Sequence, residues 1–261
     1  MEVRLDGKVA LITGGSMGMG KAMAQKFAAS GAEVAIVARR PEPLADAARE
    51  IVAAGGRCRS YAGDVSKADE LSRLFTAIQD DLGRVDILVN NAGRSQAGNF
   101  EELTDEIWQS DFDLKVFAAI RLARLAFPGM KSRRWGRIIN VLNIGAKAPG
   151  PGTAPTTVMR AAGMALTKVL AGEGAPYNIL VNCLMTGLII SDQWARRHRS
   201  VAPQQPFEEF LAEQARAQRL PMGRFGTAEE FANMACFLAS DAASYISGTA
   251  INVDGARSPV V

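Results

Sequence analysis

A glycine-rich turn between an apolar run and a helical stretch most constrains how this chain can fold. Residues 8–12 are mainly apolar, residues 13–20 include four glycines, and residues 21–30 have the composition of a helix. This order is typical of a strand, a turn and a helix. Glycines permit a tight turn and leave backbone N–H groups accessible to a pyrophosphate, whose charge the helix N-terminus stabilises. The segment is either a phosphate-binding turn or an ordinary connection, and the next elements distinguish the two.

A second apolar run, residues 33–38, ends in Arg39 and Arg40. In dinucleotide-binding units, an acidic residue at this strand end binds a ribose 2′-hydroxyl, whereas arginine can pair with a 2′-phosphate. The two arginines therefore favour NADP(H) over NAD(H). The alternative is that they only solvate the start of the next helix.

Strands and helices alternate along the rest of the chain. We expect further strands at 56–61, 85–89, 137–142, 178–183 and 250–254, and helices at 68–82, 104–130 and 154–175. This order predicts an α/β fold, a Rossmann-like doubly wound parallel sheet of about seven strands with helices on both faces. Because no repeat or linker divides the chain, residues 1–261 are expected to form one domain.

Composition argues against several classes of protein. The net charge of +3 is small and spread along the chain, so nucleic acid is not an expected partner. No apolar stretch is long enough to span a bilayer and residues 1–8 lack a signal-peptide core, so we expect no membrane association and a cytoplasmic location. The cysteines, Cys58, Cys183 and Cys236, match neither a disulfide framework nor a metal-ligand spacing, so no metal is expected.

Four segments resemble the short-chain dehydrogenase/reductase family in sequence order and spacing: 6–15, 64–65, 90–93 and 248–255. The resemblance extends over essentially the whole chain. It implies an NADP(H)-binding oxidoreductase that acts on a small carbonyl or alcohol substrate. It also implies a homotetramer or homodimer, and a segment at about 188–222 that covers the substrate.

The resemblance also implies how the cofactor is held. The glycine turn would bind pyrophosphate, Asp64 would contact adenine, the 90–93 turn would line the adenosine side, and the 187–191 segment would contact the nicotinamide carboxamide. The usual proline before Gly187 is Thr186 here. The expected cofactor-binding residues are Gly14, Ser16, Met17, Gly18, Met19, Gly20, Arg39, Arg40, Asp64, Val65, Asn91, Ala92, Gly93, Arg160, Gly187, Ile189 and Ser191.

The catalytic positions depart from the family pattern of asparagine, serine, tyrosine and lysine. In that pattern tyrosine passes the proton, lysine lowers the pKa of the tyrosine and holds the nicotinamide ribose, and serine orients the carbonyl. Alignment on the 166–171 segment places Asp113, Asn143, Thr156 and Arg160 at these four positions in turn. All four residues of the family's catalytic set are therefore replaced.

The replacements retain only part of the chemistry. The hydroxyl of Thr156 is shorter than a phenol and too weakly acidic to donate a proton near neutral pH. Arg160 keeps a positive charge that can hold ribose hydroxyls but does not release a proton. Asn143 can donate a hydrogen bond to a carbonyl, and Asp113 can accept one or act as a base. An ion pair between Asp113 and Arg160 is one arrangement that would use both.

Two other side chains are candidate proton donors. His198 lies within the 188–222 segment, and Lys147 lies in the loop after the fifth strand. Each has a simpler interpretation, His198 as part of an exposed helical face and Lys147 as a solvated loop residue.

Two functions from different classes follow. The first is an NADP(H)-dependent oxidoreductase with a non-standard proton path that uses Asn143 or Asp113 together with Arg160. The second is a protein of the same fold without hydride transfer, either a cofactor-binding regulatory subunit or an enzyme of elimination, hydrolysis or isomerisation.

Overall fold

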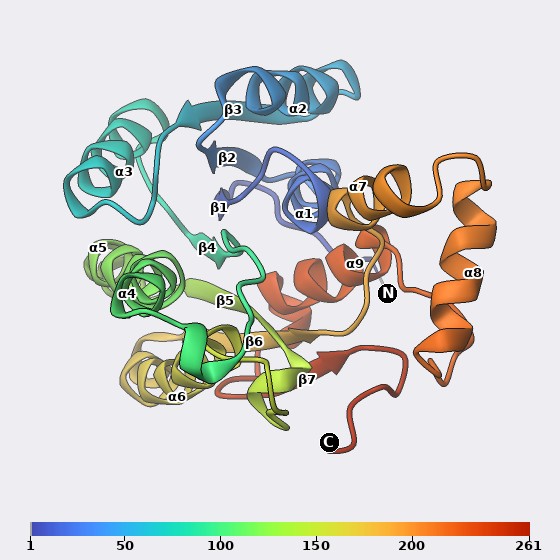
Figure 1. Ribbon diagram of the computed structural model, residues 1–261. Helices are drawn as coiled ribbons and strands as arrows, with labels where there is room; N and C mark the ends of the chain where they lie inside the picture. The colour runs from blue at the N-terminus through green and yellow to red at the C-terminus, as the bar shows by residue number, and fades with distance from the viewer. Residues whose placement is uncertain (1) are drawn as a thin grey trace.

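Seven parallel strands form one sheet at the centre of the fold (Figure 1), and the computed structural model describes residues 2–261. The order β3-β2-β1-β4-β5-β6-β7 confirms the predicted doubly wound sheet. The order reverses between β1 and β4, and ligands of such sheets bind beyond the carboxyl ends of the strands at this point. The strands are β1 (Val9–Thr13), β2 (Glu33–Ala38), β3 (Arg57–Ala62), β4 (Ile87–Asn90), β5 (Gly136–Asn143), β6 (Ile179–Thr186) and β7 (Ala250–Val253).

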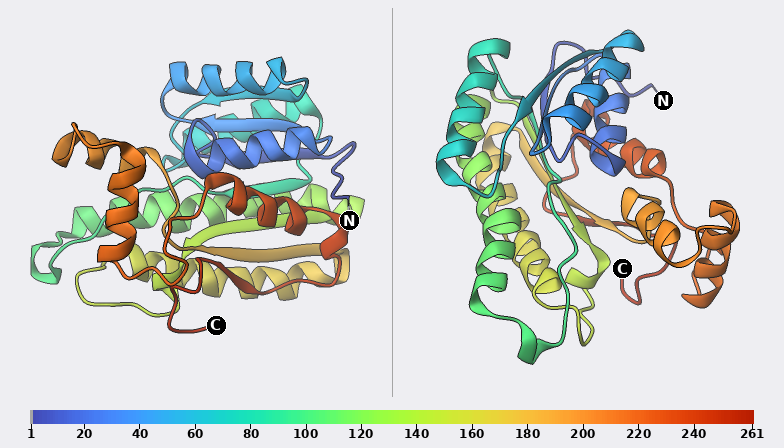
Figure 2. Two further views of the ribbon diagram at one scale, coloured as in Figure 1. Left: turned by 90° about the vertical axis from the view of Figure 1, so that its right-hand side faces the viewer. Right: turned by 45° about the horizontal axis from the view of Figure 1, so that its top comes forward.

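Helices cover both faces of the sheet (Figure 2). On one face α1, α2 and α9 pack over an apolar cluster that includes Phe27, Leu44 and Phe231. On the other face α3, α5 and α6 pack over a second cluster that includes Phe75 and Leu122. The helices are α1 (Gly18–Ala29), α2 (Pro41–Ala53), α3 (Ala68–Leu82), α4 (Asp105–Phe112), α5 (Ala118–Arg133), α6 (Thr156–Gly174), α7 (Asp192–Val201), α8 (Phe207–Ala217) and α9 (Ala228–Ala239).

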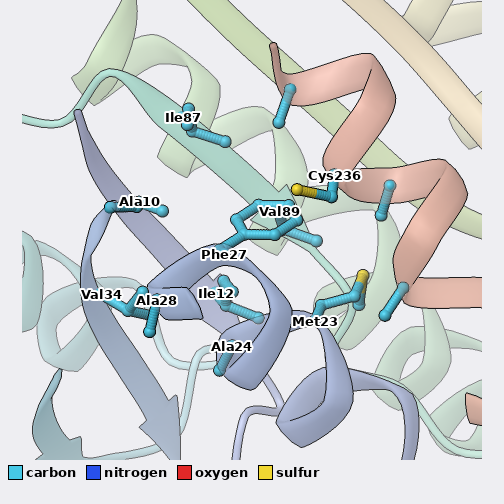
Figure 3. Packing of buried hydrophobic residues seen from close by; sticks show 14 of the residues in the cluster. Ala10, Ile12, Met23, Ala24, Phe27, Ala28, Val34, Ile87, Val89 and Cys236 are labelled. Atoms are coloured by element: carbon cyan, nitrogen blue, oxygen red, sulfur yellow. The ribbon is translucent and has the colours of Figure 1, made fainter. Parts of the chain in front are cut away.

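The contact between α1 and α9 positions the helix that follows the glycine turn. Phe27 of α1 is fully buried and lies between the strands and α9, close to Cys236 (Figure 3). The thiol of Cys236 is also within 3.3 Å of the hydroxyl of Ser30. Because replacing a buried phenylalanine by alanine typically costs about 3–5 kcal/mol, this packing holds α1 firmly against the sheet.

The predicted helix at 104–130 is divided in the structure. A π-helical turn, Asp113–Phe117, separates α4 from α5. Such turns insert an extra residue into the helical repeat and are frequent at functional sites. The turn contains both Asp113 and Lys115, and it directs them to different surroundings.

The segment at 188–222 contains α7 and α8, which lie beyond the carboxyl end of β6 (Figure 2). Phe210, Leu211, Ala215 and Phe225 form an apolar cluster of their own there. Within residues 2–261, no helix is both long and apolar enough to cross a membrane.

Candidate functional site

The turn after β1 has a backbone that requires glycine. Gly14 and Gly18 adopt φ of +68° and +54°, in the left-handed region that glycine populates readily. A Cβ atom on Gly20 would lie 2.0 Å from the carbonyl oxygen of Gly14. The first turn of α1 therefore packs directly against the β1 strand end and leaves backbone N–H groups unobstructed.

A cavity of about 490 Å³ opens at this turn, along the carboxyl ends of β1, β2 and β4. Thirteen of the residues that the sequence predicts to bind cofactor line it: Gly14, Ser16, Met17, Met19, Gly20, Arg39, Arg40, Asp64, Val65, Asn91, Ala92, Gly93 and Arg160. Gly18 lies in the same turn but outside the lining, and Ile189 lines a separate cavity of about 320 Å³. Gly187 and Ser191 flank Ile189, and neither is in the lining of the larger cavity, which Thr186 joins instead.

Two arginines stand at the end of β2, on one side of the cavity. Arg39 and Arg40 are both exposed, and Nη2 of Arg40 lies 3.4 Å from Sδ of Met17. Asp64 lies across the cavity and is partly buried, and burial by itself would raise the pKa of its carboxyl group. The hydrogen bonds from the hydroxyl and N–H of Ser66, together with the charge of Arg39, outweigh burial, so the net pKa of Asp64 is lowered.

A hydrogen-bond network ties the β4 loop to the glycine turn. Oγ1 of Thr13 accepts from the N–H groups of Asn91 and Ala92, each at 3.0 Å. The side-chain amide of Asn91 donates to the carbonyl oxygens of Thr13 and Gly14. These hydrogen bonds within the protein hold Asn91, Ala92 and Gly93 at the edge of the cavity.

The π-helical turn places Lys115 in a buried polar cluster at the inner end of the site. Its Nζ lies 2.5 Å and 2.7 Å from the two carboxylate oxygens of Asp111, one helical turn earlier. The same Nζ lies 2.5 Å from Oγ1 of Thr156, the first residue of α6. The side chains of Lys115 and Asp111 are 5% and 0% exposed, so water is largely excluded from this cluster.

Arg160 lies one turn along α6 and connects the cluster to the cavity. Its Nη1 donates to the carbonyl oxygen of Val141 at 3.0 Å, while Nε is buried without a partner. Burial lowers the pKa of this guanidinium, and the charge of Asp111 opposes the shift. A donor left without a partner beside a cavity is suited to a polar ligand, since a buried N–H normally has an acceptor.

Burial also lowers the pKa of Lys115, to about 8. The hydrogen bonds and charge of Asp111 raise it, and the charges of Arg160 and Arg94 lower it further. Such a pKa places the loss of the Lys115 proton close to neutral pH, which suits a general acid.

Asp113 does not join this cluster. Its carboxylate accepts from the side chain of Gln109 at 3.1 Å and lies 3.7 Å from Arg121. The ion pair between Asp113 and Arg160, one arrangement that the sequence left open, is therefore not formed, because Asp113 and Lys115 leave the π-helical turn in different directions. Lys115, which the sequence reasoning missed, takes the place beside Thr156.

A signal for Lys115 was available in the sequence. Asp111 and Lys115 are four residues apart in a helical stretch, the spacing at which opposite charges meet. Leu114 and Val116 flank the lysine, so the pair falls in an apolar part of the helix. Burying an ion pair costs desolvation free energy, so a buried pair of opposite charges indicates a functional or structural role.

Asn143 lies at the end of β5, as expected. Its Oδ1 is buried without a hydrogen-bond partner, next to Gly145. It is outside the lining of the 490 Å³ cavity. An unpaired acceptor at a strand end is available to a ligand that donates a hydrogen bond.

The other candidate proton donors have structural roles. Lys147 donates to the carbonyl oxygen of Ala250 at 2.6 Å and to the side chain of Asn252 at 2.8 Å. Nε2 of His198 lies 2.7 Å from the carbonyl oxygen of Gln205, and its ring packs against two phenylalanines of α8. Both therefore hold the fold together away from the Lys115 cluster.

The residues present fit a phosphorylated dinucleotide. The glycine turn lacks the Cβ atoms that would obstruct it, exposed arginines stand at the β2 end, and Arg160 carries an unpaired buried donor. Each feature supplies a donor or a positive charge to a long anionic ligand. Within residues 2–261, no group of three metal-ligating side chains is gathered at one place.

Comparison with known proteins agrees with this geometry. A family model described as Enoyl-(Acyl carrier protein) reductase matches residues 14–256. Among curated relatives, the 3-oxoacyl-[acyl-carrier-protein] reductase FabG of Thermotoga maritima is 32% identical over 97% of this chain and 98% of its own.

Two solved structures are similar over nearly the whole chain. L-Sorbose reductase from Gluconobacter frateurii, complexed with NADPH and L-sorbose, is 37% identical with a TM-score of 0.95, and each chain is covered completely. The NADPH-bound short chain oxidoreductase from Pseudomonas aeruginosa PAO1, described as containing an atypical catalytic center, is 34% identical with a TM-score of 0.92 and 99% of each chain covered.

Proposed function

Because this chain belongs to the short-chain dehydrogenase/reductase family, we propose that it is an NADPH-dependent oxidoreductase that interconverts a carbonyl and an alcohol without a catalytic tyrosine. The observation that carries the proposal is the juxtaposition of a dinucleotide-sized cavity with a buried basic cluster. Arg160 lines the cavity and also lies near Asp111, the anchor of Lys115. The chain therefore keeps positive charge where the family keeps its lysine.

The cofactor would be held by residues from several strand ends. The glycine turn takes the pyrophosphate, Arg39 and Arg40 take the 2′-phosphate, and Asp64 takes the adenine. Arg160 takes the nicotinamide ribose through its free Nε. When bound, NADPH supplies a hydride to a carbonyl carbon and is itself oxidised to NADP⁺.

The preference for NADPH is supported from two sides. Arginine forms bidentate pairs with phosphate, and the β2 end carries two of them and no carboxylate. The two similar solved structures named above contain NADPH. A carboxylate at this strand end would have favoured NADH.

The substrate is proposed to be a small hydroxylated ketone, as for the sorbose reductase, with 3-oxoacyl thioesters as the alternative class. The 188–222 segment is proposed to cover it. Its aromatic residues Trp194, Phe207 and Phe210 pack mainly against one another and Phe225, so they shape the cover more than a pocket of their own.

Calorimetry followed by a substrate panel tests this function. The purified protein is titrated with NADPH and with NADH, and NADPH oxidation is then followed with L-sorbose, D-fructose, 2,3-butanedione and an acetoacetyl thioester. We expect selective NADPH binding and turnover of at least one carbonyl. Binding without turnover of any compound, in either direction, would contradict the oxidoreductase assignment.

A non-redox function is the second candidate, and one observation favours it. Gln96 lies over one side of Thr156, since its backbone bonds to both the hydroxyl oxygen and the backbone N–H of Thr156. A partly covered threonine suits a cofactor-binding regulatory subunit, or an enzyme of elimination, hydrolysis or isomerisation that does not consume NADPH. A product formed from a substrate without oxidation of NADPH would favour this candidate.

Assembly and location are proposed on separate grounds. A surface groove of about 390 Å³ between α5 and α6 is lined by Ile120, Phe127, Leu166 and Leu170, and we propose that a second copy covers it in a homodimer or homotetramer. A free NADPH pool suits action in the cytoplasm. Light scattering of the wild type and of Leu170→Glu, which places charge in the groove, tests the assembly.

A further inference from the structure

All three N–H donors of the Lys115 ammonium are hydrogen-bonded, and only one of their acceptors could pass a proton on to a substrate. A lysine ammonium has three N–H donors and no acceptor. Nζ of Lys115 lies within 2.7 Å of both oxygens of Asp111 and 2.5 Å from Oγ1 of Thr156. All three donors are therefore used, and Thr156 is the only neutral acceptor among their partners.

The hydroxyl of Thr156 is left as a donor by the same geometry. A threonine oxygen has two lone pairs and one proton. The lone pairs accept from Nζ of Lys115 at 2.5 Å and from the N–H of Gln96 at 3.1 Å. The hydroxyl proton must then point away from both, toward a further acceptor that the described side chains do not supply.

From this geometry we propose that Lys115 is the proton donor of the reaction and that the hydroxyl of Thr156 relays its proton to the substrate oxygen. The inference rests on the proposed function and names the acid in the proton path. As the carbonyl carbon gains hydride, the oxygen takes the Thr156 hydroxyl proton, and Oγ1 takes a proton from Nζ. One Nζ–H bond breaks, the Thr156 O–H bond breaks and re-forms, and one substrate O–H bond forms. Lys115 becomes a neutral amine, and solvent returns its proton through the Thr156 hydroxyl after the product leaves.

The surrounding charges explain why Lys115 and not a neighbour is the acid. Asp111 from α4 stabilises the ammonium, while Arg160 from α6 and Arg94 from the β4 loop oppose it. Arginine does not release a proton near neutral pH, so neither Arg160 nor Arg94 can act as the donor. The lowered pKa of Lys115, about 8, agrees with this role.

Four variants in the NADPH-loaded enzyme test the relay by turnover of L-sorbose and 2,3-butanedione. Lys115→Met and Lys115→Arg should each lower kcat about 10²-fold or more, because arginine keeps the charge but not the acidity. Thr156→Val should lower kcat at least tenfold, and Thr156→Ser should restore most of it. KM for NADPH should change little, and Lys168→Met, at an exposed lysine of α6, should match the wild type.

A second measurement does not depend on turnover. In ¹⁵N-lysine-labelled enzyme bound to NADP⁺, the Nζ signal that disappears in Lys115→Met should titrate near pH 8. This titration tests the acidity of Lys115 by itself, and the kcat values of the Thr156 variants test the relay.

The outcomes separate the relay from the proposed function. Wild-type kcat in Lys115→Arg, or an ordinary titration of the Lys115 signal, overturns the relay while leaving NADPH-dependent turnover intact. Wild-type protein that binds NADPH but turns over no compound of the substrate panel contradicts the proposed function and the relay with it. Loss of turnover in both Lys115 variants, together with titration near pH 8, supports both.

Discussion

Nζ of Lys115 lies 2.5 Å from Oγ1 of Thr156, across 41 residues of the chain. This contact joins the π-helical turn to the first residue of α6. It places the acidic ammonium of Lys115 beside a threonine hydroxyl that is too weakly acidic to act as the acid. Neither side chain alone replaces a tyrosine, because the lysine is buried and the hydroxyl is weakly acidic. Together they provide a proton of suitable acidity and a path for it.

Asp111→Asn should lower the pKa of Lys115 further, because the carboxylate raises it through hydrogen bonds and charge. The decline of turnover at alkaline pH should then begin at a lower pH than in the wild type. Rates of NADPH oxidation with 2,3-butanedione from about pH 6 to about pH 9, roughly two units below and one unit above the pKa of Lys115, measure this. Asp113→Asn is the matched control, since that carboxylate bonds to Gln109 and Arg121 outside the cluster. An unshifted profile in Asp111→Asn would exclude Lys115 as the titrating group.

Lys115 should also make the stability of the protein depend on pH. Its pKa is about 8 when folded and about 10.4 when unfolded, so between these values the unfolded chain binds more protons. The free energy of unfolding should therefore rise with pH through this window, by an amount on the order of 2–3 kcal/mol from this group. Lys115→Met should remove that rise, which urea unfolding at pH 7.5 and pH 9.5, about 0.5 units below and 1.5 above the folded pKa, detects. Equal pH dependence in both proteins would contradict the lowered pKa.

Gly20→Ala should destabilise the turn and prevent NADPH binding, because its Cβ would lie 2.0 Å from the carbonyl oxygen of Gly14. Forced overpacking of this kind typically costs about 1–3 kcal/mol. Thermal unfolding and calorimetric titration with NADPH measure the two effects. Gly150→Ala is the control, since no atom lies within 4 Å of its Cβ and its φ is not left-handed. Normal NADPH binding by Gly20→Ala would show that the turn does not carry the pyrophosphate.

Arg39→Ala should weaken NADPH binding about tenfold or more, as expected from the loss of a charge-assisted pair worth about 1.5–3 kcal/mol. Binding of NADH should change little, because NADH lacks the 2′-phosphate. Calorimetric Kd values for both cofactors test this, with Arg49→Ala as a control at an exposed arginine of α2 that bonds to Asp46. An equal loss of affinity for NADPH and NADH would show that Arg39 attracts both cofactors by its charge and does not bind the 2′-phosphate specifically.

Much of the cofactor cavity was predictable because its parts are local in sequence. Gly14 and Arg39 each follow a strand directly, Gly20 lies in the first turn of the helix after β1, and parallel strands bring their carboxyl ends to one edge of a sheet. Once the strands were recognised, their ends had to meet. Gly187 and Ser191 were harder to place, because their position depends on how the chain leaves β6 toward α7.

The sequence by itself determined that the fold is a doubly wound parallel sheet with a glycine turn after its first strand. Hydrophobic periodicity and glycine spacing are local properties of the sequence, and recognising them requires no knowledge of which segments pack together. Only the tertiary structure decided which side chain stands beside Thr156. The one-residue expansion at Asp113–Phe117 rotates the helix, so that Lys115 turns into the site and Asp113 turns toward Arg121. A change of register within a helix is set by packing on both its faces, which the periodicity of the sequence does not specify.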